Sequence, residues 1–370
     1  MPTKFGRFLS GNRFPKLFLF LYIVLVTISA AATANAVGLL FAWKRLRVSI
    51  YISFAAVAVL VIWQKNYQSR PVRKLICFLR STAIYYSIWF VIFAGLSVMP
   101  FVPDKIGAIC VLLALPAAVL TVTVGYRNTK IVQTKRYDLT VNDGGQPYRI
   151  ALISDLHMGD FVRSGHIKKM ITSIKKASPD LLVISGDLFD IGHNILDEKD
   201  ELRKISGLFR KLKIPNGIYA VLGNHDPDVN DPRMKRFLKE SRIHLLDNET
   251  VDLSRITLLG RTDESCGHRT PWDEIHVAAA GKPVVVLDHR PQGIDEASQH
   301  GAELVLSGHT HQGQFFPITY LTKKANGAPY FYGMNRIRST YGITTSGAGF
   351  FGLPMRLGTR NEVVNIHLIL

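Results

Sequence analysis

Five short polar clusters in the second half of the chain contain residue types that bind divalent metal ions. They combine aspartate, asparagine and histidine with glycine, and each follows a short apolar run. The clusters are Ser154-Asp155-Leu156-His157, Gly186-Asp187, Gly223-Asn224-His225-Asp226, Asp288-His289 and Gly308-His309-Thr310-His311. Carboxylate and amide oxygens and imidazole nitrogens are hard to borderline ligands, which suit Mn, Fe or Zn better than a soft copper site.

The apolar runs that precede these clusters predict buried strands. The predicted strands are Arg149–Ser154, Leu181–Ser185, Ile218–Leu222, Thr257–Gly260, Pro283–Asp288 and Glu303–Ser307. Helix-like charged segments lie between them, at Arg163–Ala177, Glu198–Lys211, Arg233–Glu240 and Gln292–His300. Continuous apolar strands that alternate with helices indicate a largely buried α/β sheet. Three later runs predict a second sheet, in which antiparallel pairing is an option: Pro329–Tyr332, Tyr341–Thr345 and Val363–Leu370.

The position of the clusters at strand ends predicts that they converge. In open α/β sheets, ligands bind in the crevice outside the carboxyl ends of the strands. Glycines at 186, 223 and 308 let the backbone turn sharply, so that short side chains come close together. Two neighbouring cations need a shared carboxylate, and Asp187 is placed to provide it. A single aspartate after a strand is usually a turn or a cap, so the prediction rests on the complete ordered set.

The complete set resembles the calcineurin-like metallophosphoesterase superfamily, over about residues 148–370. The closing segment, from Thr345-Ser346-Gly347-Ala348-Gly349 through Arg356-Leu357-Gly358, resembles bacterial membrane-associated phosphoesterases of that superfamily. The resemblance implies an αββα sandwich, in which two mixed β-sheets are flanked by helices. It also implies two-metal hydrolysis of phosphoester or pyrophosphate bonds, with two divalent ions (Mn, Fe or Zn) as cofactors.

The resemblance also implies a role for each matching residue. The first ion would be held by Asp155, His157 and His311, the second by Asn224, His289 and His309, and Asp187 would bridge both. His225 would be a non-ligand histidine that protonates the leaving oxygen or stabilises the transition state. Gln312 departs from the pattern, because relatives often have a second small residue there. We therefore expect the floor of the substrate cleft to differ.

Composition separates the chain into two very different halves. Of the 370 residues, 47% are hydrophobic and only 20% are charged, whereas soluble domains average ~25% charged. The net charge of +17 comes mainly from residues 1–126, which hold 13 Lys and Arg against the single acid Asp104. Basic residues between apolar runs set membrane topology, so we do not predict a nucleic-acid partner. The three scattered cysteines form no CxxC pair and indicate neither a disulfide scaffold nor a thiolate metal site.

Residues 1–126 are predicted to form a membrane domain with about four transmembrane helices. The apolar stretches are Leu17–Trp43, Val48–Trp63, Thr82–Pro103 and Ile106–Tyr126. The second is short for a hydrocarbon core of ~30 Å. Residues 127–147 are predicted to be a linker, and residues 148–370 the metallophosphoesterase domain.

The basic flanks of the four stretches predict the orientation. The segments on one side of the membrane hold 13 Lys and Arg, and those on the other hold three that are not cancelled by an acid. This bias places both termini and the catalytic domain in the cytoplasm, on a multi-pass protein of the inner (plasma) membrane. An alternative is that Leu17–Ile28 and Ala34-Asn35-Ala36 form a cleaved signal peptide, which would leave the sidedness unchanged.

The favoured function is a membrane-anchored phosphohydrolase, with a lipid-linked phosphoester as one substrate option. The alternatives are a protein phosphatase, a cyclic-nucleotide phosphodiesterase, or a membrane regulator with little activity. Phe315-Phe316 could line a groove for lipid tails or pack in the core. Lys168-Lys169 and Lys175-Lys176 are expected on a solvated helix face that could also touch anionic headgroups.

Overall fold

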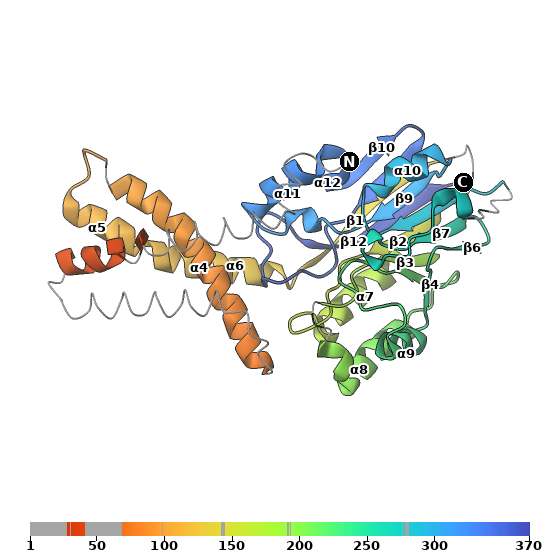
Figure 1. Cartoon of the computed structure of the whole chain (residues 1–370), viewed down its shortest axis with the longest axis horizontal. Coiled ribbons are helices and arrows are strands. Elements are labelled where there is room, and N and C mark those ends of the chain that lie inside the picture. Colours follow the sequence, from red (N-terminus) through yellow and green to blue (C-terminus); the bar gives the residue numbers. More distant parts are fainter. Residues whose placement is uncertain are drawn as a thin grey trace. The chain divides into compact units, whose positions relative to one another are not determined.

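The computed structural model describes residues 28–29, 31–40, 69–97, 99–141, 145–190, 192, 194–275, 277 and 281–370. The chain divides into two compact units (Figure 1). We call Asn128–Gly352 with Arg356–Leu370 the sheet unit, and the helices before Asn128 the helical unit. The second predicted apolar stretch and most of the first lie outside the described residues.

The helical unit contains two segments that are long and apolar enough to cross a membrane. They are α4 (Arg70–Ser97) and the pair α5 (Asp104–Leu112) and α6 (Ala114–Asn128), which together form one segment. A shorter apolar helix covers Ala31–Leu40. The described residues therefore contain two candidates for the four predicted transmembrane helices, in the regions of the third and fourth apolar stretches.

Helix α4 differs from the stretch predicted at Thr82–Pro103, because it begins at Arg70 and ends at Ser97. Lysine and arginine are good helix formers, so the helix also includes the basic residues that precede the predicted stretch, which are Arg70, Arg73, Lys74 and Arg80. Pro100 and Pro103 disfavour helix in the residues before them, which explains the earlier end.

The sheet unit contains two six-stranded sheets, whose orders are β1-β12-β2-β3-β4-β5 and β10-β11-β9-β8-β7-β6. Sheet one consists of β1 (Val132–Thr140), β12 (Asn361–Ile369), β2 (Tyr148–Ile153), β3 (Leu181–Ser185), β4 (Ile218–Val221) and β5 (Ile243–Leu245). Sheet two consists of β10 (Gly333–Ile337), β11 (Thr340–Thr344), β9 (Leu304–Ser307), β8 (Val284–Asp288), β7 (Thr257–Arg261) and β6 (Glu249–Asp252). Both sheets are mixed, as predicted. In sheet one β2 to β5 are parallel and β12 runs antiparallel to β2. In sheet two β7, β8, β9 and β11 are parallel.

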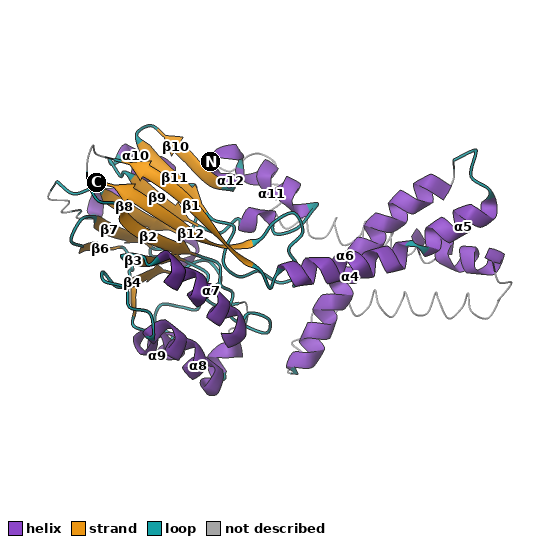
Figure 2. Cartoon of the chain, turned by 180° about the vertical axis from the view of Figure 1, so that it is seen from behind, coloured by secondary structure: helices purple, strands orange, loops and turns teal. Residues whose placement is uncertain are grey.

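The described part of the sheet unit contains six helices outside the two sheets, and short 3₁₀ helices lie in its loops. Sheet one is covered by α7 (Ser164–Ala177), α8 (Lys199–Arg210) and α9 (Pro232–Ser241), and on the side of sheet two lie α10 (Gly293–Gln299), α11 (Ile318–Asn326) and α12 (Ala328–Phe331) (Figure 2). The 3₁₀ helices are η1 (Asn194–Asp197), η2 (Glu264–Cys266), η3 (Trp272–Glu274) and η4 (His311–Gly313). The predicted helices match α7 to α10 to within two residues.

The alternation of side chains along the strands explains why the sheet unit has four layers, with helices, sheet one, sheet two and helices in that order. In β2, Ile150 and Leu152 belong to the core between the sheets, whereas Ala151 and Ile153 belong to the core under α7 to α9. Successive side chains of a strand point to opposite faces, so a fully apolar strand needs a partner on each side. The second sheet supplies one partner and the helices supply the other. The predicted two-sheet α/β sandwich is thus confirmed.

Several segment assignments from the sequence are wrong. The run Val363–Leu370, predicted in the second sheet, forms β12 of sheet one. The strands predicted at Thr257–Gly260, Pro283–Asp288 and Glu303–Ser307 as part of the first sheet belong to sheet two, because the apolar pattern of a strand does not show which sheet it joins.

The segment 127–147, predicted as a linker, contains β1, which pairs with β12 along its whole length. Its mostly polar residues suit a sheet edge and hide the strand signal. The strand predicted at Pro329–Tyr332 is instead helix α12, and β10 begins only at Gly333. Proline at the start of a segment suits the first turn of a helix, where no backbone donor is needed. Strands β5 and β6 were not predicted.

Candidate metal centre

All eight predicted site residues follow the carboxyl ends of five strands. Sheet one contributes the residues after β2, β3 and β4, and sheet two contributes those after β8 and β9. These residues are Asp155, His157, Asp187, Asn224, His225, His289, His309 and His311. The structure brings all eight together.

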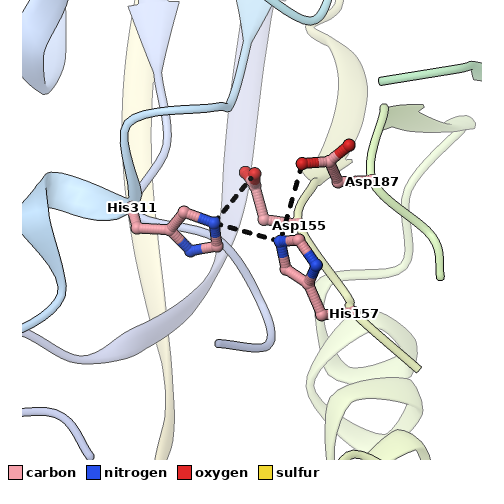
Figure 3. A group of neighbouring side chains, drawn as sticks. All are labelled: Asp155, His157, Asp187 and His311. Atoms are coloured by element: carbon pink, nitrogen blue, oxygen red, sulfur yellow. Dashed lines mark hydrogen bonds and ion pairs between the residues drawn. The ribbon is translucent and has the colours of Figure 1, made fainter. Parts of the chain in front are cut away.

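Four of these residues form a compact buried group (Figure 3). One side-chain oxygen or nitrogen from each of Asp155, His157, Asp187 and His311 lies within 4.8 Å of the others. The Nε2 atoms of His157 and His311 are 3.1 Å apart. His157 Nε2 is 3.6 Å from Asp187 Oδ2, and His311 Nε2 is 3.4 Å from Asp155 Oδ1.

The chemistry of this group fits a divalent cation. Burial lowers the pKa of His157 to about 3 and that of His311 well below its usual value, so both rings are neutral at pH 7. Among the described residues, neither Nδ1 atom of these two rings has a hydrogen-bond partner. The Nε2 lone pairs instead face two buried carboxylates, whose charge is costly without compensation. A cation bound by N and O ligands would accept the Nε2 lone pairs of both rings and neutralise the charge of the two carboxylates.

A second set of donor atoms also includes a histidine that lies near Asp187. His289 Nε2 is 3.3 Å from Asp187 Oδ2 and 3.2 Å from Asn224 Oδ1. His309 Nδ1 is 2.9 Å from Asn224 Oδ1 and 3.3 Å from His289 Nε2. The Nδ1–H of His289 donates to the Ser185 carbonyl (2.8 Å), which turns Nε2 toward the other donors. Burial opposes a charge on His289, but Asp187 outweighs it and raises its pKa to about 10.

The backbone of five of these residues is left-handed, which is uncommon for residues other than glycine. The φ angles are 52° at Asp155, 45° at His157, 53° at Asp187, 69° at His309 and 51° at His311. Each such residue costs about 1–3 kcal/mol and persists only where its surroundings enforce it. Hydrogen bonds from the Asp155 and His157 N–H groups to the carbonyls of Gly186 and Asp187, both 3.0 Å, hold two of the turns.

Two glycines allow the turns to approach one another. A Cβ atom at Gly223 would overlap Asp187 Oδ1, and one at Gly308 would overlap the Ser154 hydroxyl and the Asp155 carboxylate. Glycine was expected at these positions because the turns come close together. The contacts at Gly223 and Gly308 confirm that expectation.

His225 lies beside the group of four without being part of it. Its ring is 5.4 Å from that of His157 and stacks on Phe351, with centroids 4.7 Å apart and planes inclined by 22°. Its backbone N–H donates to Asp187 Oδ1 (2.9 Å). The backbone of His225 therefore supports Asp187, while the imidazole is held at the edge of the group.

Three residues that shape the site were not identified from the sequence. Phe351 is held by Gln314, whose side-chain amide accepts from the Phe351 N–H (2.8 Å) and donates to its carbonyl (2.9 Å). Asp226 accepts from the N–H groups of Phe189 (3.0 Å) and Gly223 (2.9 Å), which ties the turns after β3 and β4 together. Only Asp226 carried a sequence signal, because it ends the Gly223-Asn224-His225-Asp226 cluster.

Arg356 is a buried cation that bonds almost entirely to backbone carbonyls. It donates to the carbonyls of His311 (2.8 Å), Ser346 (2.7 Å) and Gly349 (2.6 Å), and to Asn361 Oδ1 (2.9 Å). Burial lowers its pKa to about 10, so it is charged at neutral pH. It therefore joins the turn that carries His311 to the loop between β11 and β12.

Replacing Arg356 with methionine is expected to destabilise the chain by about 3 kcal/mol, because three buried carbonyls lose their donor. The melting temperature of the purified chain should fall by about 6–12 °C. Arg360→Met is the matched control, since that partly exposed side chain donates to a single carbonyl among the described residues, that of Thr359. Equal shifts for the two variants would contradict this structural role.

Residues 148–313 match the family model of the calcineurin-like phosphoesterases. A Danio rerio protein named transmembrane protein with metallophosphoesterase domain is 32% identical over 238 residues, which are 60% of this chain and 53% of the relative. An uncharacterized metallophosphoesterase of Helicobacter pylori is 30% identical over 252 residues, 66% of this chain and 65% of its own. One of Aquifex aeolicus is 28% identical over 256 residues, 67% of this chain and 95% of its own. The chain thus spans between about half and two thirds of the length of the first two relatives.

Proposed function

We infer that this chain, which carries a calcineurin-like metallophosphoesterase domain, is a metal-dependent phosphoric ester hydrolase anchored in a membrane. The observation that carries the proposal is the buried group of Asp155, His157, Asp187 and His311, which fits a divalent cation. This family implies hydrolysis of phosphoric esters with bound metal.

We further propose that the site holds two ions. Asp155, His157 and His311 would bind the first, and Asn224, His289 and His309 the second, as the family resemblance implies. The position of Asp187 Oδ2 supports a bridging role, because it lies 3.6 Å from His157 Nε2 and 3.3 Å from His289 Nε2. The mixed N and O donors favour Mn, Fe or Zn.

The chain's own residues would then orient the ester and move one proton. Bound divalent ions supply Lewis-acid charge at a phosphoryl group and acidify water for in-line attack. His225 would give its proton to the leaving oxygen as the P–O bond breaks. The stacking of its ring on Phe351 supports this role, because it restricts the direction in which the imidazole points.

We propose that four transmembrane helices anchor the chain in the inner (plasma) membrane, with the catalytic domain in the cytoplasm. Two apolar helical segments and the excess of basic residues on one side support this topology. Only residues 129–131 separate the end of α6 from the start of β1. If α6 crosses the membrane, the catalytic domain stays close to its surface, which favours a lipid-linked phosphoester or pyrophosphate as substrate.

The test uses the full-length chain in bicelles with added Mn²⁺. We expect hydrolysis of an aryl phosphoester, and faster hydrolysis of a lipid-linked pyrophosphate than of its water-soluble headgroup ester. Chelation should abolish both activities. Undiminished turnover after removal of all metal would contradict metal dependence. Equal rates for the two esters would exclude the lipid preference and favour a phosphoprotein or a cyclic nucleotide as substrate.

A further inference from the structure

Exposed large hydrophobic side chains are rare in the described part of the sheet unit. The five that occur are Ile131, Phe316, Ile318, Tyr320 and Met334. All other exposed large hydrophobic side chains of the described residues lie between positions 28 and 124, in and around the apolar helices. Three of the five thus fall within five consecutive positions at the start of α11.

Helix α11 differs from the helices packed on sheet one, because none of its side chains is buried. Tyr320, Lys323 and Lys324 lie three and four residues apart and so share one face. Tyr320 is 63% exposed, and Phe316, just before the helix, is 57% exposed. Both lysines are exposed, and the helix contains no acidic residue.

The chemistry of this face matches that of a bilayer surface. Tyrosine places an apolar ring and a polar hydroxyl at the boundary between headgroups and acyl chains. Lysine keeps its ammonium group in water while its stem lies along apolar surface. Lys323 and Lys324 give the sequence of α11 a net charge of +2, which complements the negative charge of anionic lipids.

Helix α11 is also firmly connected to the metal centre. It begins seven residues after His311, and the Thr319 N–H donates to the Phe315 carbonyl (3.0 Å). A Cβ atom at Gly313 would overlap the backbone of Thr319, so the start of the helix packs directly on the η4 turn. Phe315 is buried, whereas Phe316 points outward. A surface bound by α11 therefore lies near the residues proposed to bind metal.

We propose that Phe316 and the Tyr320, Lys323 and Lys324 face of α11 dock onto the interfacial region of an anionic lipid bilayer. This docking would hold the metal centre at the membrane surface, where a lipid-linked ester is presented. The inference rests on the proposed membrane anchoring, and it adds a second membrane contact outside the transmembrane helices.

The test attaches one nitroxide label to the cysteine of Tyr320→Cys in the full-length chain. The native cysteines Cys77, Cys110 and Cys266 are changed to serine, so that only this position is labelled. Each nanodisc holds one chain, which excludes contact with a second copy. In discs with anionic lipid we expect the label to be accessible to oxygen and protected from a water-soluble nickel complex. A label at Lys176, in the last turn of α7, is the control and should show the reverse. Equal nickel accessibility at both positions would overturn the proposal, as would protection of position 320 from both reagents, which indicates protein packing.

The lysines provide a second arm with a matched pair. Lys323→Gln with Lys324→Gln should shift the docking equilibrium about 30-fold toward the free state. Lys175→Gln with Lys176→Gln neutralises the two adjacent lysines in the last turn of α7, for which the sequence offered headgroup contact as an option, and should have no effect if α11 is the docking helix. No difference between the pairs would contradict binding to anionic lipid.

A third measurement requires no substitution. In the unmodified chain, amide exchange over residues 318–326 should be slower in discs with anionic lipid than in zwitterionic discs, and equal exchange would count against docking. Hydrolysis of a soluble aryl phosphoester by the same preparations tests the proposed function separately. Loss of that activity with intact docking, or docking failure with intact activity, identifies which proposal is wrong.

Discussion

Replacing Asp187 with asparagine is expected to lower phosphoester hydrolysis by about 10³-fold or more and to reduce the content of both metal ions. Asp187 Oδ2 lies 3.6 Å from His157 Nε2 and 3.3 Å from His289 Nε2, so a single substitution removes a negative charge from both proposed ion positions. The amide has nearly the same shape as the carboxylate, and the loss would therefore reflect charge. Rates with an aryl phosphodiester and elemental analysis of the purified chain provide the measurement.

Asp138→Asn is the control for this substitution. Asp138 is an exposed carboxylate on β1 that pairs with Arg136 (2.7 Å) and belongs to none of the five polar clusters. Its replacement should change neither rate nor metal content. Asp187→Asn with two bound ions and more than a tenth of the activity would contradict the bridging role.

Removal of the His225 imidazole should slow hydrolysis by ~10²–10⁴-fold while both ions stay bound. In His225→Ala the backbone N–H that donates to Asp187 is retained, so the support of that carboxylate survives. Asn224→Ala should instead lose metal, because Asn224 Oδ1 lies 3.2 Å from His289 Nε2 and 2.9 Å from His309 Nδ1. Equal metal loss in the two variants would mean that His225 is a ligand.

The leaving group provides a further check on His225. If its imidazole protonates the leaving oxygen, the loss in His225→Ala should be larger for an alkyl ester than for a p-nitrophenyl ester, whose leaving group needs no proton. The same loss for both esters would show that His225 acts by stabilising charge or by binding the substrate. Asn224→Ala, partly reloaded with Mn²⁺, is the comparison, and its loss should not depend on the leaving group in this way.

Local sequence was sufficient for the central strands and for the grouping of the site. Leu181–Ser185 was predicted with the same bounds as β3, because five consecutive apolar or small residues between polar turns have one stable solution, a strand covered on both faces. Parallel strands place their carboxyl ends at one edge, so the polar clusters after β2, β3 and β4 had to meet. The residues that follow β8 and β9 join them because the second sheet packs face to face on the first.

The tertiary structure decided features that carry no local signal. Strand β1 is defined by pairing with β12, more than 200 residues later, and its own polar sequence resembles a linker. The left-handed backbone at Asp155, His157 and Asp187 is unfavourable locally and is enforced by the neighbouring turns.

The contacts that orient the site are likewise long-range. Arg356 reaches His311 and Phe351 reaches His225 across separations of 45 residues or more in sequence. Residue types and strand order therefore determined which side chains can do chemistry in this protein. Their orientation depended on packing and hydrogen bonds between distant segments, which exist only once both sheets have formed.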